Sequence, residues 1–205
     1  VKKAGGIWSL EDFAQYTVVE REPLRIEHRG FKLVTAPPPS SGGVALAEMF
    51  NILSGWNYPA LAPVERMHLM IEAMRRAYRD RGEYLGDPDF VTVPVERMLS
   101  QDYAAGLRAG IHPSRATPSD MLSPVGRKPE RPDTTHFSIL DTAGNVIAVT
   151  QTVNLSFGNG FVVPGTGFLL NNEMDDFSAA PGVPKAIGLV GDESNEIDTG
   201  KRPLS

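Results

Sequence analysis

Apolar residues in the first half of the chain recur at the spacing of one helix face in two segments. After residue 43 they are Leu46, Met49, Phe50 and Leu53. From about Val64 to Arg81 they are Met67, Met70, Ile71, Met74 and Tyr78. We predict a helix in each segment. Because methionine adapts to irregular gaps in cores, the second face is interpreted as core filling rather than a ligand site.

Capping and turn residues predict the shorter elements of this half. Ser9 is followed closely by acidic residues, which is typical of a helix start, because a serine hydroxyl accepts a free amide and acids favour the first turn. Residues 112–133 are rich in Pro, Ser and Arg and predict an exposed, mobile segment. The other expected elements are a helix from Ser9 to about Tyr16, paired strands over 24–27 and 32–35, and helical pieces near 94–99 and 101–108.

The pattern changes to that of β-strands at Thr134. Two β-rich runs, 134–140 and 145–154, are separated by a short polar stretch that contains a glycine. A three-residue loop, Thr142 to Gly144, suits a type I turn closed by a glycine in the left-handed region. This register predicts that Thr134 faces Thr152, with Asn154 two residues further on the same side of its strand.

Composition narrows the possible partners. The net charge is −5, the pI is about 5.4 and there is no basic stripe, so a nucleic-acid partner is not expected. The apolar runs are too short for a transmembrane segment. Without cysteine, disulfides, thiolate metal sites and a cysteine nucleophile are excluded. His28, His68 and His112 share no ligand spacing, so we expect no metal site and no cofactor.

Thr134 is the first candidate for chemistry. An N-terminal threonine carries its own base, a free α-amino group with a pKa near neutrality, but only if the bond from Asp133 to Thr134 breaks. Local composition alone favours a simpler interpretation, in which the two threonines are a β-branched strand start. His136 lies two residues further on, and a structural role in the strand is favoured over a Ser–His type relay.

An acidic segment is the second candidate. We expect Phe168–Leu170 to form a buried strand that leads into Glu173, Asp175 and Asp176. These carboxylates could hold an ammonium group through charge-assisted hydrogen bonds, or a divalent cation. A solvated turn that caps a helix is the commonest origin of such a run, and the spacing has no EF-hand pattern.

Five motifs taken together strongly resemble the γ-glutamyltranspeptidase family. They occur in that family's order and at its usual separations, and the similarity covers almost the whole chain. One such motif alone is weak, whereas five long ones are very specific. The motifs are Pro37–Gly43, Tyr84–Phe90, Thr134–Ser138, Asn171–Ser178 and Lys201–Ser205.

This resemblance implies an α+β fold, the four-layer αββα sandwich of the N-terminal-nucleophile hydrolases, incomplete in this chain. It implies a precursor that cleaves itself between Asp133 and Thr134. Residues 1–133 then form the C-terminal part of the large subunit and 134–205 the N-terminal part of the small subunit, intertwined in one domain. The Thr134 hydroxyl is implied to attack γ-glutamyl amides such as glutathione and to pass the glutamyl group to water or an amine.

The resemblance also implies roles for other residues. Thr152 matches a threonine that hydrogen-bonds the nucleophile. Asn154, Glu173 and Asp176 match residues that hold the substrate's α-amino group, and their oxygens suit an ammonium ion. Ser205 matches the first of two serines that contact the α-carboxylate.

Other family features differ from this chain or fall outside it. Residues 181–191 resemble the lid loop, with Ile187 where some bacterial relatives carry a tyrosine. The family's α-carboxylate arginine, second serine and Gly-Gly oxyanion hole are not among these 205 residues. Since one oxyanion donor is worth about 10²–10³ in rate, we expect the isolated chain to be inactive without the remaining parts of both subunits. Bacterial relatives are usually periplasmic or secreted, which is the location that the resemblance implies.

Three alternatives remain open. A cephalosporin (glutaryl) acylase has the same fold, but its substrate lacks the α-amino group that Glu173 and Asp176 would bind, so the acidic pair favours γ-glutamyl substrates. A poly-γ-glutamate depolymerase is a second enzymatic alternative. A degenerate, uncleaved homologue with a binding role is the third, and retention of Thr134 and Thr152 argues against it.

Overall fold

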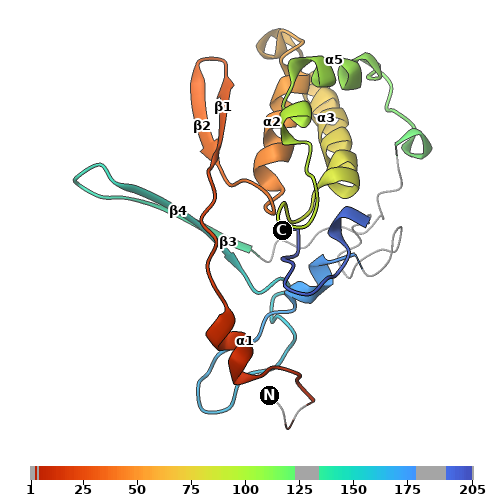
Figure 1. The fold of residues 1–205 in the computed structure, drawn as a ribbon. Helices are drawn as coiled ribbons and strands as arrows, with labels where there is room; N and C mark the ends of the chain where they lie inside the picture. Colours follow the sequence, from red (N-terminus) through yellow and green to blue (C-terminus); the bar gives the residue numbers. More distant parts are fainter. Residues whose placement is uncertain (1–2, 4, 123–133, 179–192, 205) are drawn as a thin grey trace. The chain divides into compact units, whose positions relative to one another are not determined.

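The chain divides into two compact units, each of which combines segments from both sides of residue 133 (Figure 1). The computed structural model describes residues 3, 5–122, 134–178 and 193–204. Unit 1 comprises Val1–Arg21 and Pro132–Glu173, and unit 2 comprises Glu22–Arg131 and Met174–Ser205. Both contain helical and extended segments, as expected of an α+β chain.

Unit 1 begins with a capped helix, α1 (Leu10–Gln15). The Ser9 hydroxyl accepts the amide of Asp12 at 3.2 Å, and the Asp12 carboxylate accepts the Ser9 amide at 2.6 Å. This reciprocal pair satisfies two amides that have no partner inside the helix. The predicted helix start at Ser9 is therefore confirmed.

The two long strands of unit 1 form an antiparallel hairpin with the predicted register. β3 (Thr134–Leu140) pairs with β4 (Val146–Thr152), and Leu140 faces Val146. The turn is closed by Gly144 with φ of 84°, a conformation that disfavours a β-carbon. The exposed Asp141 carboxylate accepts the amide of Asn145 at 2.8 Å, and hydrogen bonds from Asn145 lower its pKa.

The buried strand predicted at Phe168–Leu170 is wrong. Leu169 forms only an isolated bridge with Val162, and the Phe168 side chain is 72% exposed. Gly165, with φ of 81°, lies in the turn between Val162 and Leu169, and the backbone pairing around it is short, with the Val163 amide donating to the Phe168 carbonyl at 2.8 Å. Its apolar side chains instead line a pocket of about 700 Å³ together with Trp8, Leu10 and Phe13 from the α1 region.

Unit 2 is a helical layer accompanied by a two-stranded sheet. Its main core joins α2 (Gly42–Leu53), α3 (Pro63–Tyr84) and α5 (Gln101–Ala109), and it contains Ile52, Leu69, Ala73, Ala104 and Ile111. The ring of His28 stacks on Phe50 of α2 at 4.5 Å. The elements are β1 (Leu24–His28), β2 (Phe31–Thr35), α2 (Gly42–Leu53), η2 (Tyr58–Ala60), α3 (Pro63–Tyr84), α4 (Val95–Met98), α5 (Gln101–Ala109), η3 (Ser119–Met121), most of η4 (Glu173–Asp176) and η5 (Glu193–Asn195). The helices and the hairpin predicted in this region are confirmed.

The methionine face of α3, interpreted as core filling, is left substantially exposed by the described residues of this chain. Met67, Met70 and Met74 are between 36% and 53% exposed. The buried face instead carries Ala73 and Ala77, whose small side chains permit close approach, and charged residues that pair internally. Helical spacing of apolar residues identified the helix but not the face that it buries.

A buried ion pair on α3 anchors the chain at Thr117. The Arg76 guanidinium donates to the Glu72 carboxylate at 2.6 Å, and the amide of Thr117 donates to the same carboxylate at 3.0 Å. Glu72 and Arg76 are only 1% and 3% exposed. Although burial acts to raise it, hydrogen bonds from Thr117 and Arg76 lower the pKa of Glu72 to about 2.

The segment after residue 193 is fixed to the C-terminal end of α3. The Ser194 hydroxyl contacts the carbonyl of Leu85 at 3.2 Å, and the buried Asp87 carboxylate accepts the amide of Arg202 at 2.9 Å. A β-carbon at Gly86 would lie 2.1 Å from the Ser194 carbonyl oxygen, so glycine permits this approach. Leu204 completes a second core cluster with Val44, Leu85 and Met98.

Candidate functional site

The candidate site in unit 1 is centred on two threonines at the open end of the hairpin. Thr134 begins β3 and faces Thr152, the last residue of β4. Thr134 is exposed, whereas Thr152 is half-buried. Facing residues in an antiparallel pair present their side chains to the same side of the sheet at about 5 Å between β-carbons. Two hydroxyls therefore lie at one edge of the hairpin.

Asn154 extends this arrangement from the end of β4. Its amide donates to the Thr152 hydroxyl at 2.9 Å, and its φ of 71° places it in the left-handed region. Asparagine adopts this conformation more readily than most residues, and such strained positions concentrate at functional sites. The backbone turn thus orients the Thr152 oxygen as an acceptor.

Asn172 fixes this turn and was not predicted as a site residue. Its carbonyl oxygen accepts the Asn154 side-chain amide at 3.2 Å, and its side-chain oxygen accepts the amide of Leu155 at 3.0 Å. Its own amide donates to the carbonyl of Val153 at 3.3 Å. The signal for this role was its place inside the Asn171–Ser178 motif, directly before the acidic segment.

The acidic segment forms the single-turn helix η4. Its first residue, Glu173, donates its amide to the Asn171 side chain at 3.0 Å. Its last residue, Asp176, is half-buried in unit 2, and its carbonyl accepts the Asn195 side chain at 2.7 Å. Phe177, 5% exposed, anchors the end of the turn.

Two predicted site residues and the lid lie outside the described residues. They are Asp133, Ser205 and the lid at 181–191 with Ile187. Leu204, the neighbour of Ser205 in sequence, is described and is 2% exposed. Its amide donates to the Asn195 side-chain oxygen at 3.0 Å.

His136 has the contacts of a strand residue. Its Nδ1 lies 2.7 Å from the hydroxyl of its cross-strand partner Thr150, and its Nε2 lies 3.4 Å from the Ser138 hydroxyl. Both of these partners are hydroxyl groups, and neither is a carboxylate. This arrangement supports the structural interpretation of His136.

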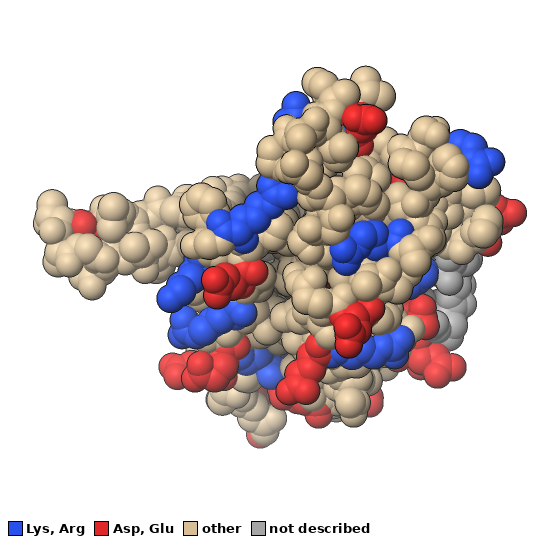
Figure 2. All heavy atoms as spheres, turned by 90° about the horizontal axis from the view of Figure 1, so that it is seen from above, with Lys and Arg blue, Asp and Glu red and all other residues tan. Residues whose placement is uncertain are grey.

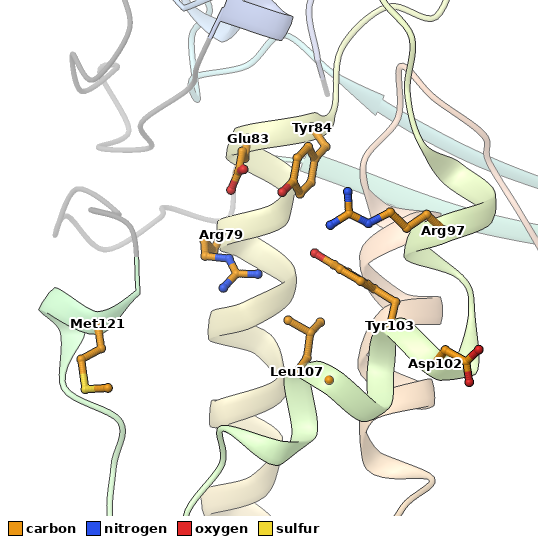
Figure 3. A pocket seen from close by; sticks show the side chains of 9 residues that line it. Arg79, Glu83, Tyr84, Arg97, Asp102, Tyr103, Leu107 and Met121 are labelled. Carbon is orange, nitrogen blue, oxygen red and sulfur yellow. The ribbon is translucent and has the colours of Figure 1, made fainter.

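A polar pocket of about 420 Å³ opens beside α3 and α5 in unit 2 (Figure 3). The Arg97 guanidinium lies over the rings of Tyr84 and Tyr103, at 5.4 and 4.8 Å from their centroids. Tyr103 donates its hydroxyl to Asp80 at 2.7 Å, and burial together with this bond raises the pKa of Tyr103. Such a phenol stays protonated at neutral pH, so Tyr103 itself is not an activated nucleophile.

Next to this network, Glu48 and Asp80 form a buried carboxyl pair. Both side chains are 0% exposed, and no donor reaches the Glu48 oxygens among the described residues. Burial and the facing Asp80 carboxylate raise the pKa of Glu48 to about 9. The Asp80 carboxylate also accepts from Arg79 at 2.7 Å. The pair is a structural feature of the α2–α3 contact.

The described surface shows no concentration of one charge on the face drawn in Figure 2, where basic and acidic side chains intermingle. Within the described ranges, no group of three or more His, Asp or Glu side chains is arranged to hold a metal ion. No helix in those ranges has both the length and the apolar content needed to cross a bilayer.

Comparison with known proteins identifies the family. A family model described as Gamma-glutamyltranspeptidase matches residues 1–205. The chain belongs to the γ-glutamyltranspeptidase family. Within it, a glutathione hydrolase proenzyme of Pseudomonas sp. (strain A14) is 47% identical over 207 residues, which cover 100% of this chain and 36% of that protein. The chain thus spans about a third of the length of this relative.

Solved structures related to this family have a similar backbone. Cephalosporin acylase from Bacillus halodurans matches with a TM-score of 0.79 and 30% identity over 99% of this chain and 34% of its own. The γ-glutamyltranspeptidase of Helicobacter pylori matches with a TM-score of 0.57 and 41% identity over 60% of this chain and 36% of its own. Both transferase-type and acylase-type proteins therefore share this arrangement.

Proposed function

We propose that this chain is part of a longer γ-glutamyltranspeptidase and glutathione hydrolase whose nucleophile is Thr134. The observation that carries the proposal is the pairing of Thr134 with Thr152, whose hydroxyl also accepts the Asn154 amide at 2.9 Å. A hydroxyl nucleophile needs a neighbouring base and an orienting partner. Cleavage before Thr134 would supply the base as its free α-amino group, and Thr152 would orient the hydroxyl.

The proposed cleavage begins at the same hydroxyl. The Thr134 oxygen attacks the carbonyl carbon of Asp133, the carbon–nitrogen bond breaks, and the acyl group moves from nitrogen to oxygen as an ester. The Thr134 nitrogen takes up the proton and becomes a free amine. Water then hydrolyses the ester, which leaves the Asp133 carboxylate and restores the Thr134 hydroxyl.

Turnover repeats this chemistry on the substrate. The Thr134 oxygen attacks the γ-carbonyl carbon of a γ-glutamyl amide. The hydroxyl proton passes through the α-amino group of Thr134 to the leaving amine, and a glutamyl ester of Thr134 remains. Water or an acceptor amine attacks that ester and releases the glutamyl group. In this proposal Asn154, Glu173 and Asp176 accept from the α-ammonium, and Ser205 donates to the α-carboxylate.

A glutaryl acylase is the second candidate, favoured by the TM-score of 0.79 to the Bacillus halodurans acylase. The two activities differ in whether the site must hold an α-ammonium group. Glu173 and Asp176 supply two carboxylates in one helical turn, which suits that group. We therefore favour the γ-glutamyl substrate, and the ratio of kcat/KM for γ-glutamyl and glutaryl anilides separates the candidates.

The parts of the protein beyond this chain complete the proposal. We propose that the remaining segments of both subunits close the four-layer sandwich around the hairpin and supply the oxyanion donors. By family resemblance the complete protein is periplasmic or secreted, and fractionation of the native host tests that location.

Intact mass spectrometry of the full-length protein under denaturing conditions tests the proposal first. Two chains are expected, the smaller beginning at Thr134. A γ-glutamyl anilide should be turned over by the same preparation. A single uncut chain without turnover would contradict the proposed function, while the family membership would stand.

A further inference from the structure

Asn195 joins two segments of unit 2 that carry different parts of the proposed site. Its side-chain nitrogen donates to the carbonyl of Asp176 at 2.7 Å, and its side-chain oxygen accepts the amide of Leu204 at 3.0 Å. The residue is 1% exposed. Both ends of one buried amide are thus occupied by backbone groups that lie 19 and 9 positions away.

The orientation of this amide is defined by its partners. The Asp176 carbonyl can only accept and the Leu204 amide can only donate. If the oxygen and nitrogen of the Asn195 side chain were exchanged, two acceptors would face each other at Asp176 and two donors at Leu204. The Asn195 backbone is also held, because its carbonyl accepts the amide of Ser178 at 2.8 Å beside a parallel bridge from Ser178 to Glu196. The side chain therefore acts as a spacer of fixed length.

Both attached segments have further anchors. Ser194 contacts the carbonyl of Leu85 through its hydroxyl, and Leu204 packs in the core with Leu85 and Met98. The Asp87 carboxylate accepts the amide of Arg202 two residues earlier. The Asn195 bridge is thus tied to the end of α3 rather than to a free loop.

The two segments have complementary tasks in the proposed function, on which this inference rests. Asp176 is assigned to the α-ammonium, and Leu204 directly precedes Ser205, which is assigned to the α-carboxylate. These two groups are attached to the same carbon of a γ-glutamyl substrate, so their binding groups must keep a defined separation. We propose that Asn195 is a positioning residue that sets this separation and thereby the preference for substrates carrying both groups.

The test uses full-length protein with Asn195→Ala and the isosteric Asn195→Asp, which keeps the acceptor for Leu204 and removes the donor to Asp176. For γ-glutamyl anilide, KM is expected to rise about 10- to 100-fold while kcat changes by less than about threefold. Self-cleavage should persist. For glutaryl anilide, which has no α-ammonium group, KM should change by less than about threefold.

Asn51→Ala is the matched control. Asn51 is also a buried asparagine that bridges two groups, donating to the carbonyl of Leu99 at 2.8 Å and accepting from Gln101 at 2.8 Å. Its loss should lower thermal stability to a similar degree without the selective rise in KM. If Asn195→Ala does not fold, Asn195→Asp carries the test alone, because it preserves side-chain volume.

The outcomes separate this inference from the proposed function. An uncut wild-type protein without γ-glutamyl turnover contradicts the proposed function itself. A cut and active wild type whose Asn195 variants keep the wild-type KM contradicts only the role of Asn195. If the Asn195 variants change KM equally for both anilides, or if Asn51→Ala shows the same rise in KM, the effect is a general structural one and the positioning role is overturned.

Discussion

Thr134 and Thr152 face each other across the open end of the β3–β4 hairpin, at the first and last positions of their pairing. The tight turn at Gly144 sets this register, because a slip of one residue would move the side chains of one strand to the opposite face. The relationship between the two hydroxyls thus depends on a turn at the far end of the hairpin.

Replacing Thr134 with alanine should abolish both self-cleavage and turnover of the full-length protein. The variant lacks the only oxygen proposed to attack either carbonyl, and loss of a nucleophile commonly lowers kcat by more than about 10³-fold. Denaturing mass spectrometry and an anilide assay measure the two effects. Thr135→Ala is the control, because Thr135 points to the opposite face of β3 and pairs with Gln151. Anilide turnover by Thr134→Ala at the wild-type rate would rule out the mechanism.

Replacing Thr152 with valine should slow turnover by about 10- to 100-fold. Valine keeps the branched shape but leaves the Asn154 amide without its hydroxyl acceptor, a loss of about 1–3 kcal/mol. The rate of single-turnover acylation measures the effect. Thr150→Val removes a hydroxyl two positions earlier on the same face and should change this rate by less than about threefold. Equal effects in both variants would argue against a specific role for Thr152.

Stability should fall as pH rises from about 4.5 toward 9 because of Glu48. Its pKa is about 9 in the folded protein and 4.5 as its ordinary value, so folding takes up a proton between these limits. The contribution of Glu48 to the free energy of unfolding is complete below about pH 4.5 and is lost as pH approaches 9. The free energy of unfolding declines by at most about 1.4 kcal/mol per pH unit over this range. The facing charged groups are Asp80 and Arg79.

Glu48→Gln provides the test of this pH dependence. Glutamine keeps a donor for Asp80 and cannot ionise, so chemical denaturation between pH 5 and 9 should show a smaller decline than in the wild type. Glu96→Gln changes an exposed glutamate on α4 and should leave the decline unchanged. If the free energy of unfolding declines equally with pH in Glu48→Gln and in the wild type, titratable groups other than Glu48 cause the decline.

Acid should destabilise the protein through the Glu72–Arg76 pair. The pKa of Glu72 is about 2, below its ordinary 4.5, so its contribution is present above about pH 4.5 and is lost as pH falls toward 2. At neutral pH, Glu72→Gln leaves Arg76 buried without a charge partner and should lower the free energy of unfolding by about 3 kcal/mol. Urea denaturation measures both effects. If Glu72→Gln lowers the free energy of unfolding by less than about 0.5 kcal/mol, the effect is that of a typical surface substitution and contradicts the prediction.

The 205-residue chain on its own should not turn over a γ-glutamyl anilide. The proposed oxyanion donors belong to other parts of the protein, and each is worth about 10²–10³ in rate. The isolated chain is compared with the full-length protein at equal concentration. Robust turnover by the isolated chain would show that these donors are dispensable.

Local signals predicted the hairpin and the short elements well. The register from Thr142 to Gly144 and the cap at Ser9 follow from interactions between residues close in sequence. The errors concern burial. Periodicity could not distinguish the exposed methionine face of α3 from the face that packs on α2, because the buried face uses alanines and paired charges.

Residues that connect distant segments left no pattern to recognise. Asn195 is a single polar residue in a stretch expected to be a loop, and its bridging role depends on Asp176 and Leu204. Glu48 lies among apolar neighbours on α2, and it faces Asp80, 32 positions further on, with both side chains fully covered. Such roles depend on tertiary contacts that sequence spacing does not encode.

The composition of the two units determines what a break before Thr134 would produce. Val1–Arg21 shares unit 1 with Pro132–Glu173, and Glu22–Arg131 shares unit 2 with Met174–Ser205. Neither product of the cut would contain a whole unit. To separate, the products would have to open both units at once, so the lifetime of the pair would follow an unfolding rate rather than a dissociation constant. Dilution alone would not part them.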